Sequence, residues 1–301
     1  MVKSRSAPLM EEMPLHPSHE PMEQAEQAEQ AEQMDQTDPG PGPADAAAPP
    51  AMDRTIVKVF SLMELLAMSE QPMGVSAIAQ QLQLQKSNVH RLLQTLKALG
   101  YVQQHTRSSR YSLTLKTWEF GMKVAGRNAI KRVALPFMRM LHQQHPEHVH
   151  LSVLIGSDIL YLESISATFP IRAATPAGGR IPAIFPASGK ALLAHSPMAR
   201  EIVTDLIRTC PQAAGLDLET VMAELGDIAS RGYATSISGW RVNVNSVAAP
   251  IVVSDGSAVA AVGISGPTER MPLDLLTKLS TAVMNTAAQI GEILSSNADS
   301  D

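Results

Sequence analysis

Apolar residues in the first third of the chain recur at helical spacing, which predicts three helices in close succession. A dense apolar run from Asp53 to Met68 predicts the first, and a second, shorter helix is expected from its N-cap Ser76 to Leu82. After a turn, the apolar stripe from Val89 to Leu99 predicts a third helix, which Gly100 ends as a left-handed C-cap residue. The first helix would then support a helix-turn-helix pair.

Two short strands follow the third helix, at Tyr101-Val102 and from Tyr111 to Leu113. The loop between them, from His105 to Arg110, carries Arg107 and Arg110, which we expect at its tip. A helix pair followed by a basic hairpin is typical of a winged helix-turn-helix, which places its second helix in the major groove of DNA. Chance look-alikes are an alternative, because a polar helix face is often only a solvated face.

The outward face of the third helix is rich in short polar and cationic side chains, which suit phosphate oxygens and base edges. From Asp53 to Thr117 the chain holds eight Lys or Arg against three Asp or Glu, although its overall net charge is −5. An aromatic content of 4% argues against base stacking and favours double-stranded DNA. The residues expected to contact DNA, with Lys97 on their flank, are Lys86, Ser87, Asn88, His90, Arg91, Gln94, Thr95, Arg107 and Arg110.

The remaining two thirds mix helical and strand patterns. The stretch from Leu115 to about Arg127 predicts a linker helix with exposed apolar residues, a candidate dimer contact. Further helices are predicted at about 128–146, after Pro186, and at 200–208, 218–231 and 273–294. Strands are predicted at 149–155, 159–166, 171–174, 233–237, 244–253 and 258–265. Strands in runs with helices at the margins indicate an α+β domain.

Residues 1–52 differ in composition from the rest of the chain. They contain a Glu-Gln-Ala repeat from Glu23 to Gln33, and ten acidic residues against Lys3 and Arg5. Such a segment buries too little apolar surface to offset its ordering entropy, so we expect it and residues 297–301 to be disordered. The charge of the first segment raises the hypothesis that it competes with DNA for the basic domain.

Length and composition narrow the class of protein further. A chain of 301 residues with 45% hydrophobic residues suffices for two domains. No apolar run approaches the roughly 20 residues of a membrane span, and a signal-peptide pattern is missing, so we expect a cytoplasmic protein without membrane contact. Cys210 is the single cysteine, which excludes an intrachain disulfide framework and a thiolate-rich zinc site.

From Asp53 to the C-terminus, several stretches together resemble the IclR family of bacterial transcriptional regulators. The string from Leu84 to Leu93 is similar to the family's recognition helix. Signature stretches of its second domain occur in the usual order at 187–194, 231–233, 247–250 and 264–267. The resemblance implies an α+β protein with a winged helix-turn-helix at 53–115, a linker helix at 116–128 and a GAF-like effector-binding domain at 129–296. It also implies a homodimer or homotetramer that binds a palindromic operator under the control of a small-molecule effector, with no cofactor.

Carried over position by position, the family's effector pocket would involve Ile181, Ala187, Ser188, Ser236, Val244, Ser246, Gly263 and Ser265. The chain departs from the family pattern because no acidic residue follows the Gly-Tyr pair between Thr235 and Trp240, and Ser246 replaces a frequent cysteine. We therefore expect a neutral, hydroxyl-lined pocket for an organic acid or an aromatic metabolite. Arg172 or Arg180 would supply charge for an anionic effector, and the helix start after Pro186 would offer backbone N–H groups.

Two features of the second domain bear on other functions. His142, His145, His148 and His150 lie within nine residues, but Pro146 separates them into two pairs that need not converge, so we expect no metal site. No Ser/His/Asp, paired-carboxylate or phosphate-loop pattern occurs, so no catalytic residue is expected, although an enzyme remains an alternative. An architectural DNA-binding protein without an effector is the other alternative, against which the apolar α+β body argues.

Overall fold

The computed structural model describes residues 52–169 and 175–298. Their contacts divide the chain into two compact units, one ending at Val124 and the other beginning at Ala125. This division falls within α5 (Leu115–Arg127), the helix expected as a linker. Within the described ranges, no helix combines the length and hydrophobicity needed to cross a membrane.

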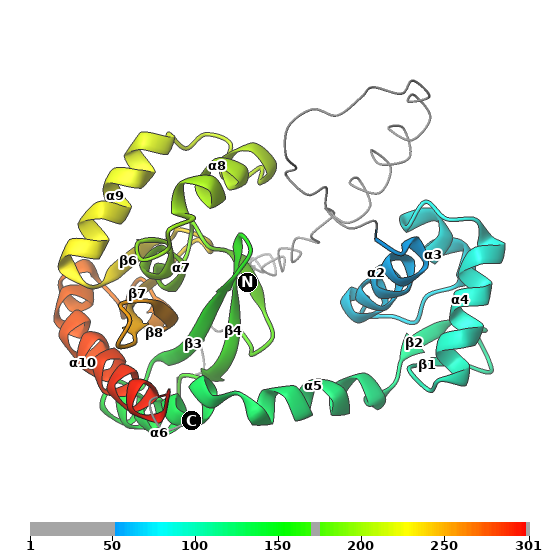
Figure 1. The fold of residues 1–301 in the computed structure, drawn as a ribbon, viewed down its shortest axis with the longest axis horizontal. Coiled ribbons are helices and arrows are strands. Elements are labelled where there is room, and N and C mark those ends of the chain that lie inside the picture. Colours follow the sequence, from blue (N-terminus) through cyan, green and yellow to red (C-terminus); the bar gives the residue numbers. More distant parts are fainter. Residues whose placement is uncertain (1–51, 170–174, 299–301) are drawn as a thin grey trace, which may run out of the picture. The chain divides into compact units, whose positions relative to one another are not determined.

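The first unit is a winged helix-turn-helix, as the sequence predicts (Figure 1). It consists of α2 (Arg54–Met68), α3 (Val75–Gln81) and α4 (Lys86–Ala98), followed by the antiparallel pair β1 (Val102–Gln104) and β2 (Tyr111–Leu113). Leu62, Ile78 and Leu93 lie at the centre of its core and are inaccessible to solvent. The helical spacing of the apolar residues therefore gave the buried faces correctly.

The ends of these helices follow local chemistry, with one correction. Asp53 caps α2, because its carboxylate accepts hydrogen bonds from the backbone N–H groups of Thr55 and Ile56, at 2.8 and 3.3 Å. Gly100 adopts the expected left-handed conformation after α4, with φ of 78°. The prediction that Ser76 is the N-cap of α3 was wrong: the helix starts at Val75, and Gly74 occupies the cap position without a side-chain bond.

The second unit is built around one antiparallel sheet. Its strands are β3 (His148–Ile155), β4 (Asp158–Ile165), β5 (Arg180–Pro182), β6 (Ala234–Ile237), β7 (Val244–Val252) and β8 (Ala258–Pro267). They lie in the order β5-β4-β3-β8-β7-β6, and β3 and β8 pair with His150 opposite Gly263. The pairing of β3 with β8 makes neighbours of residues far apart in the chain, such as His150 and Gly263, which are more than 110 positions apart.

Helices cover both faces of this sheet (Figure 1). On one face, α6 (Ala129–Gln144) and α10 (Leu273–Ala298) pack in a core with Leu151, Val247 and Val262. On the other face, α7 (Ala187–Leu193) contacts the sheet, with α9 (Leu218–Arg231) against α7 and α8 (Ala199–Thr209) against α9. The fold is α+β, as expected.

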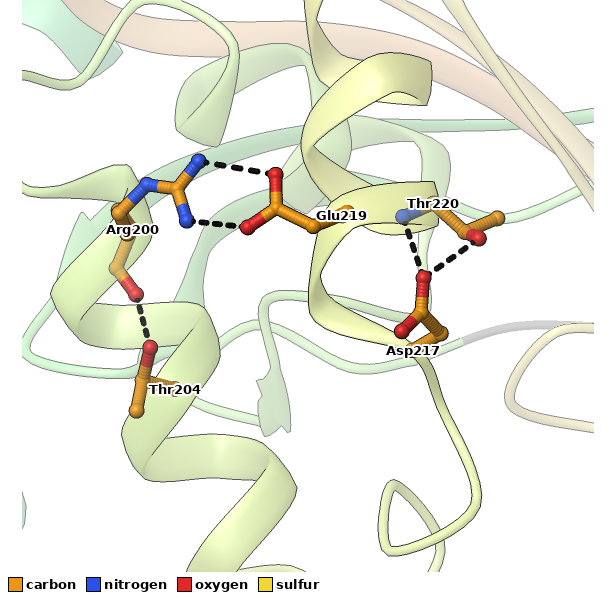
Figure 2. Close-up of polar contacts among 5 residues, drawn as sticks. All are labelled: Arg200, Thr204, Asp217, Glu219 and Thr220. Atoms are coloured by element: carbon orange, nitrogen blue, oxygen red, sulfur yellow. Dashed lines mark hydrogen bonds and ion pairs between the residues drawn. The ribbon is translucent and has the colours of Figure 1, made fainter.

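Polar contacts fix α8 and the start of α9 to each other (Figure 2). The Arg200 guanidinium donates to both carboxylate oxygens of Glu219, at 2.7 and 3.2 Å. Asp217 caps α9 by accepting from the Thr220 backbone N–H at 2.9 Å and from its hydroxyl at 2.8 Å. Because these groups are exposed, we assign them to helix placement and not to a binding site.

Three elements of this unit differ from the sequence prediction or lie outside the described residues. The strand predicted at 171–174 lies outside the described residues. The strand β5 was missed, because three residues are too few to show an alternating pattern. The last helix continues to Ala298, so residues 297 and 298, expected in a disordered tail, are helical.

Candidate nucleic-acid interface and ligand pocket

The helix α4 exposes a continuous polar face. Its apolar residues Val89, Leu92, Leu93 and Leu96 are buried, which turns the side chains between them outward. Asn88 is half-buried, and the other predicted contact residues of this helix are exposed: Lys86, Ser87, His90, Arg91, Gln94 and Thr95. Hydrogen bonds within this face are few and long, such as 3.4 Å from Gln94 Nε2 to His90 Nε2. Most of its donors are thus free for a partner, although the Thr95 hydroxyl donates to the Arg91 carbonyl.

The wing lies against the end of α4. Lys97 donates to the Gln104 side chain on β1 at 3.2 Å, which joins the helix flank to the hairpin. The His105 N–H donates to the Arg110 carbonyl at 2.8 Å and closes the loop, so Arg107 lies at the tip and Arg110 at its base. Both arginines are exposed. The prediction that both arginines lie at the tip was therefore wrong for Arg110, whose carbonyl accepts the hydrogen bond that closes the loop.

In the second unit, polar residues gather on one face of the sheet. Successive side chains of a strand point to opposite faces. Val149 and Leu151 belong to the core with α6 and α10, so His148, His150 and Ser152 face α7. The same alternation turns Ser246 on β7 and Ser265 on β8 toward α7, since their neighbours Val247 and Ile264 lie in the opposite core.

These strands line a small pocket of about 50 Å³ beside α7. Its lining residues come from β3 to β8, from the segments before β5 and β7, and from the N-cap of α7. They are His150, Tyr161, Thr175, Ile181, Pro186, Ser236, Trp240, Arg241, Val244, Ser246 and Ser265. Among the described residues that line it, Arg241 is the one charged group, and no carboxylate is present.

The loop between β6 and β7 presents Trp240 and Arg241 to this pocket. Ser238 and Asn243 at its two ends adopt positive φ angles of 48° and 62°, a strained conformation for residues with a side chain. The Asn243 N–H donates to the Ser238 hydroxyl at 3.1 Å, and the Ser238 N–H donates to the Val244 carbonyl at 2.9 Å. The Trp240 ring packs on Phe185 with 5.4 Å between ring centres. The loop is therefore held in one shape.

Burial keeps the imidazoles of His148 and His150 neutral. Burial, reinforced by the neighbouring His148, lowers the pKa of His150 to about 3. Burial also lowers the pKa of His148 to about 4, although its contact with the Ile165 backbone acts in the opposite direction. The pKa of Tyr161 rises to about 12, again through burial, against a smaller opposing effect of the Ser188 hydroxyl. At neutral pH these three side chains are uncharged hydrogen-bonding groups.

Comparison with known proteins assigns both units. The model of the IclR helix-turn-helix domain matches residues 55–106, and that of the bacterial transcriptional regulator IclR C-terminal domain matches residues 122–292. The chain belongs to the IclR family. It is a DNA-binding transcriptional regulator, and its second unit is the family's effector-binding domain.

Individual relatives agree with this assignment. The HTH-type transcriptional regulator KdgR of Dickeya chrysanthemi is 31% identical over 258 residues, covering 82% of this chain and 83% of that protein. An IclR family regulator of Brucella abortus has a similar structure, with a TM-score of 0.70 at 23% identity over 82% of this chain and 96% of that one. An IclR homologue of Microbacterium hydrocarbonoxydans, solved as a complex with 4-hydroxybenzoate, matches with a TM-score of 0.66 at 24% identity over 79% and 98%.

The predicted effector residues of this IclR-family protein divide into two groups. Ile181, Ser236, Val244, Ser246 and Ser265 line the pocket. Ala187, Ser188 and Gly263 do not: they are buried behind the wall, with Ser188 beside Tyr161 and Gly263 against the His150 ring. The pocket reaches α7 only at Pro186, so the first N–H groups of this helix do not border it.

Sequence reasoning missed the charged and aromatic part of the pocket. The Arg180 guanidinium is bound elsewhere, to the Ile155 carbonyl at 3.1 Å and to Asp158 at 3.5 Å, while Arg172 lies outside the described residues. The charge comes from Arg241, in a loop without periodicity. The sequence presents His150 only as a candidate metal ligand. Among the described residues, no group of three or more His, Cys, Asp or Glu is placed to hold a metal ion.

Proposed function

We propose that this protein controls transcription by binding a palindromic operator as a dimer or tetramer, with an affinity that depends on a small effector bound in the pocket beside α7. The observation that carries the proposal is the coexistence of two features in one chain. One is the exposed polar face of α4 beside a basic wing, and the other is a sheet pocket whose described lining has one cation, several buried hydroxyl groups and the imidazole of His150.

At the operator, we assign the two kinds of contact to different residues. Lys86, Ser87, Asn88 and His90 stand in the first turns of α4, the part of a recognition helix that reaches base edges. Arg91 and Lys97, with Arg107 and Arg110 of the wing, supply phosphate contacts, which weaken as salt rises. Gln94 and Thr95 complete the helix face toward the wing.

For the effector, we propose an organic acid or an aromatic metabolite. Arg241 offers a positive partner for a carboxylate, and Trp240 and Tyr161 offer ring surfaces. The homologue solved with 4-hydroxybenzoate is consistent with this class, since that compound is both an acid and an aromatic. Effector binding changes DNA affinity only if the two functional states bind the effector differently.

For assembly, we propose that α5 joins two copies of the chain. Leu115, Trp118, Phe120, Met122 and Val124 leave 47–77% of their surface exposed on this one helix. An apolar stripe of this kind marks a protein contact. We place the assembled regulator in the cytoplasm, where its DNA target lies.

The test is fluorescence-anisotropy binding of the full chain to DNA flanking its own coding sequence, with a scrambled duplex of equal length as the control. We expect tight binding to one flanking duplex at two salt concentrations, and a change of affinity with at least one organic acid or aromatic metabolite. Equal binding of both duplexes at each salt concentration would contradict a sequence-specific regulator.

A further inference from the structure

Among the described residues that line the effector pocket, one carries a positive charge, Arg241. The Arg241 side chain is exposed, and its charge acts on the pocket interior, because it contributes to the pKa shifts of Tyr161 and His148, secondary to their burial. The strained turn between Ser238 and Asn243 and the packing of Trp240 on Phe185 hold the backbone of this loop. A carboxylate entering beside Trp240 therefore meets a cation carried by a loop whose backbone is held.

The wall formed by His150 and Tyr161 is polar, and the described residues in it carry no charge at neutral pH. The His150 ring is 2% exposed, lies 5.8 Å from the His148 ring and meets the Tyr161 ring edge-on at 5.3 Å. Its Nδ1 atom is buried without a hydrogen-bond partner. Since buried polar atoms are nearly always paired, this unpaired atom on a pocket wall indicates a ligand or water partner.

The His150 ring cannot move away or gain a proton easily. Gly263 on the adjacent strand lies so close that even an added Cβ would stand 2.7 Å from His150 Nε2. Among the described residues, a second cation beside His150 would need protonation of an imidazole whose pKa burial has lowered to about 3. The hydroxyl groups of Ser246 and Ser265 add neutral donors and acceptors on the same face.

We propose that the pocket selects small monoanions over dianions: one carboxylate pairs with Arg241, and an uncharged hydroxyl, carbonyl or phenol group hydrogen-bonds to the His150 wall. This inference rests on the proposed function and narrows its ligand class. A second carboxylate at the His150 end would lose its hydration without gaining a cation, and an unpaired buried charge is strongly unfavourable.

Three matched pairs of compounds test the proposal by isothermal titration of the full chain at neutral pH. The pairs are glycolate and malonate, 3-hydroxypropanoate and succinate, and 4-hydroxybenzoate and terephthalate. In each pair one carboxylate is constant, and an uncharged group is replaced by a second carboxylate. We expect at least one monoanion to bind, and to bind at least about tenfold more tightly than its dianion, which corresponds to about 1.4 kcal/mol.

Variants locate the preference in the pocket. Arg241→Gln should weaken binding of the monoanion at least about tenfold, whereas Arg241→Lys should keep the preference for the monoanion, because it keeps the charge. Arg180→Gln is the matched control, since it removes a guanidinium from a residue that does not line the pocket. A dianion that binds as tightly as its partner, or failure of all three monoanions to bind, would overturn the inference. Neither result concerns DNA binding, and loss of operator specificity would instead refute the proposed function.

Discussion

Gly263 on β8 lies directly opposite His150 on β3, and the two residues are so close that a methyl group on Gly263 would stand 2.7 Å from His150 Nε2. The same methyl group would come within 2.8 Å of the Val247 carbonyl oxygen and 2.9 Å of the Ala248 Cβ atom. Neither the strand backbone nor the buried ring can move to relieve such a contact without a cost in stability. The glycine thus fixes the position of the imidazole at the pocket wall.

Gly263→Ala should therefore destabilise the second unit, by about 1–3 kcal/mol for an overpacked core. The measurement is urea unfolding followed by circular dichroism. Gly226→Ala is the matched control: Gly226 lies in the exposed part of α9 with nothing within 4 Å of an added Cβ, so alanine should stabilise by up to about 1 kcal/mol. An unchanged unfolding midpoint for Gly263→Ala would show that the strand contact is looser than described.

Acid should destabilise this unit through its buried histidines. The pKa values of His148 and His150 are about 4 and 3 in the folded protein, below the ordinary value of 6.5. Below pH 6.5 the unfolded chain therefore binds more protons, so stability falls as pH drops toward the folded values and is constant above 6.5. Each histidine should lower the free energy of unfolding by about 2 kcal/mol between about pH 7 and pH 5.

The control for this prediction is His150→Asn, which keeps a neutral polar side chain but removes one titrating group. Its unfolding free energy should fall less between the same two pH values than that of the wild type, whatever its stability at neutral pH. Parallel slopes for the two proteins would mean that His150 titrates normally. The comparison of slopes also cancels the contribution of the carboxylates, which both proteins share.

The sequence predicts the elements of this protein better than its pocket. Helical spacing identified the buried face of α4 from Val89 to Leu96, because one helix turn is a local feature. The pocket depends on strand order, which places His150 beside Gly263 across more than 110 residues. Without that order, the alternating polar residues of β3 resembled a possible metal site. Trp240 and Arg241 stand in a loop whose shape depends on positive φ angles at Ser238 and Asn243, and sequence patterns do not reveal these.

In the DNA-binding unit, base reading and phosphate binding should separate by mutation. Asn88 lies in the first turn of α4, so Asn88→Ala should relax sequence preference and leave the dependence of affinity on salt unchanged. Arg107 at the wing tip should act through phosphate, so Arg107→Ala should weaken binding to all sequences and reduce the salt slope by about 1. Anisotropy titrations over a salt series, with the specific and scrambled duplexes, distinguish the two effects.

The control for the cationic variant is Lys278→Ala, an exposed lysine on α10 in the other unit. It should leave both affinity and slope unchanged. If Asn88→Ala changed only the slope, the assignment of base reading to this residue would be wrong. If Arg107→Ala changed only the preference among sequences, the wing would be a base-reading element.

The exposed apolar residues of α5 should govern assembly and, through it, operator affinity. Trp118 and Phe120 leave 63% and 66% of their surface accessible, and burying such area stabilises by about 25 cal/mol per Å². Removing both rings in Trp118→Ser/Phe120→Ser should shift the mass measured by light scattering toward the monomer on dilution. It should also weaken operator binding, because a monomer contacts only one half-site. Leu273→Ser, at a residue equally exposed on α10, controls for general loss of apolar surface. An unchanged mass and an unchanged affinity for a two-half-site operator would place the dimer contact elsewhere.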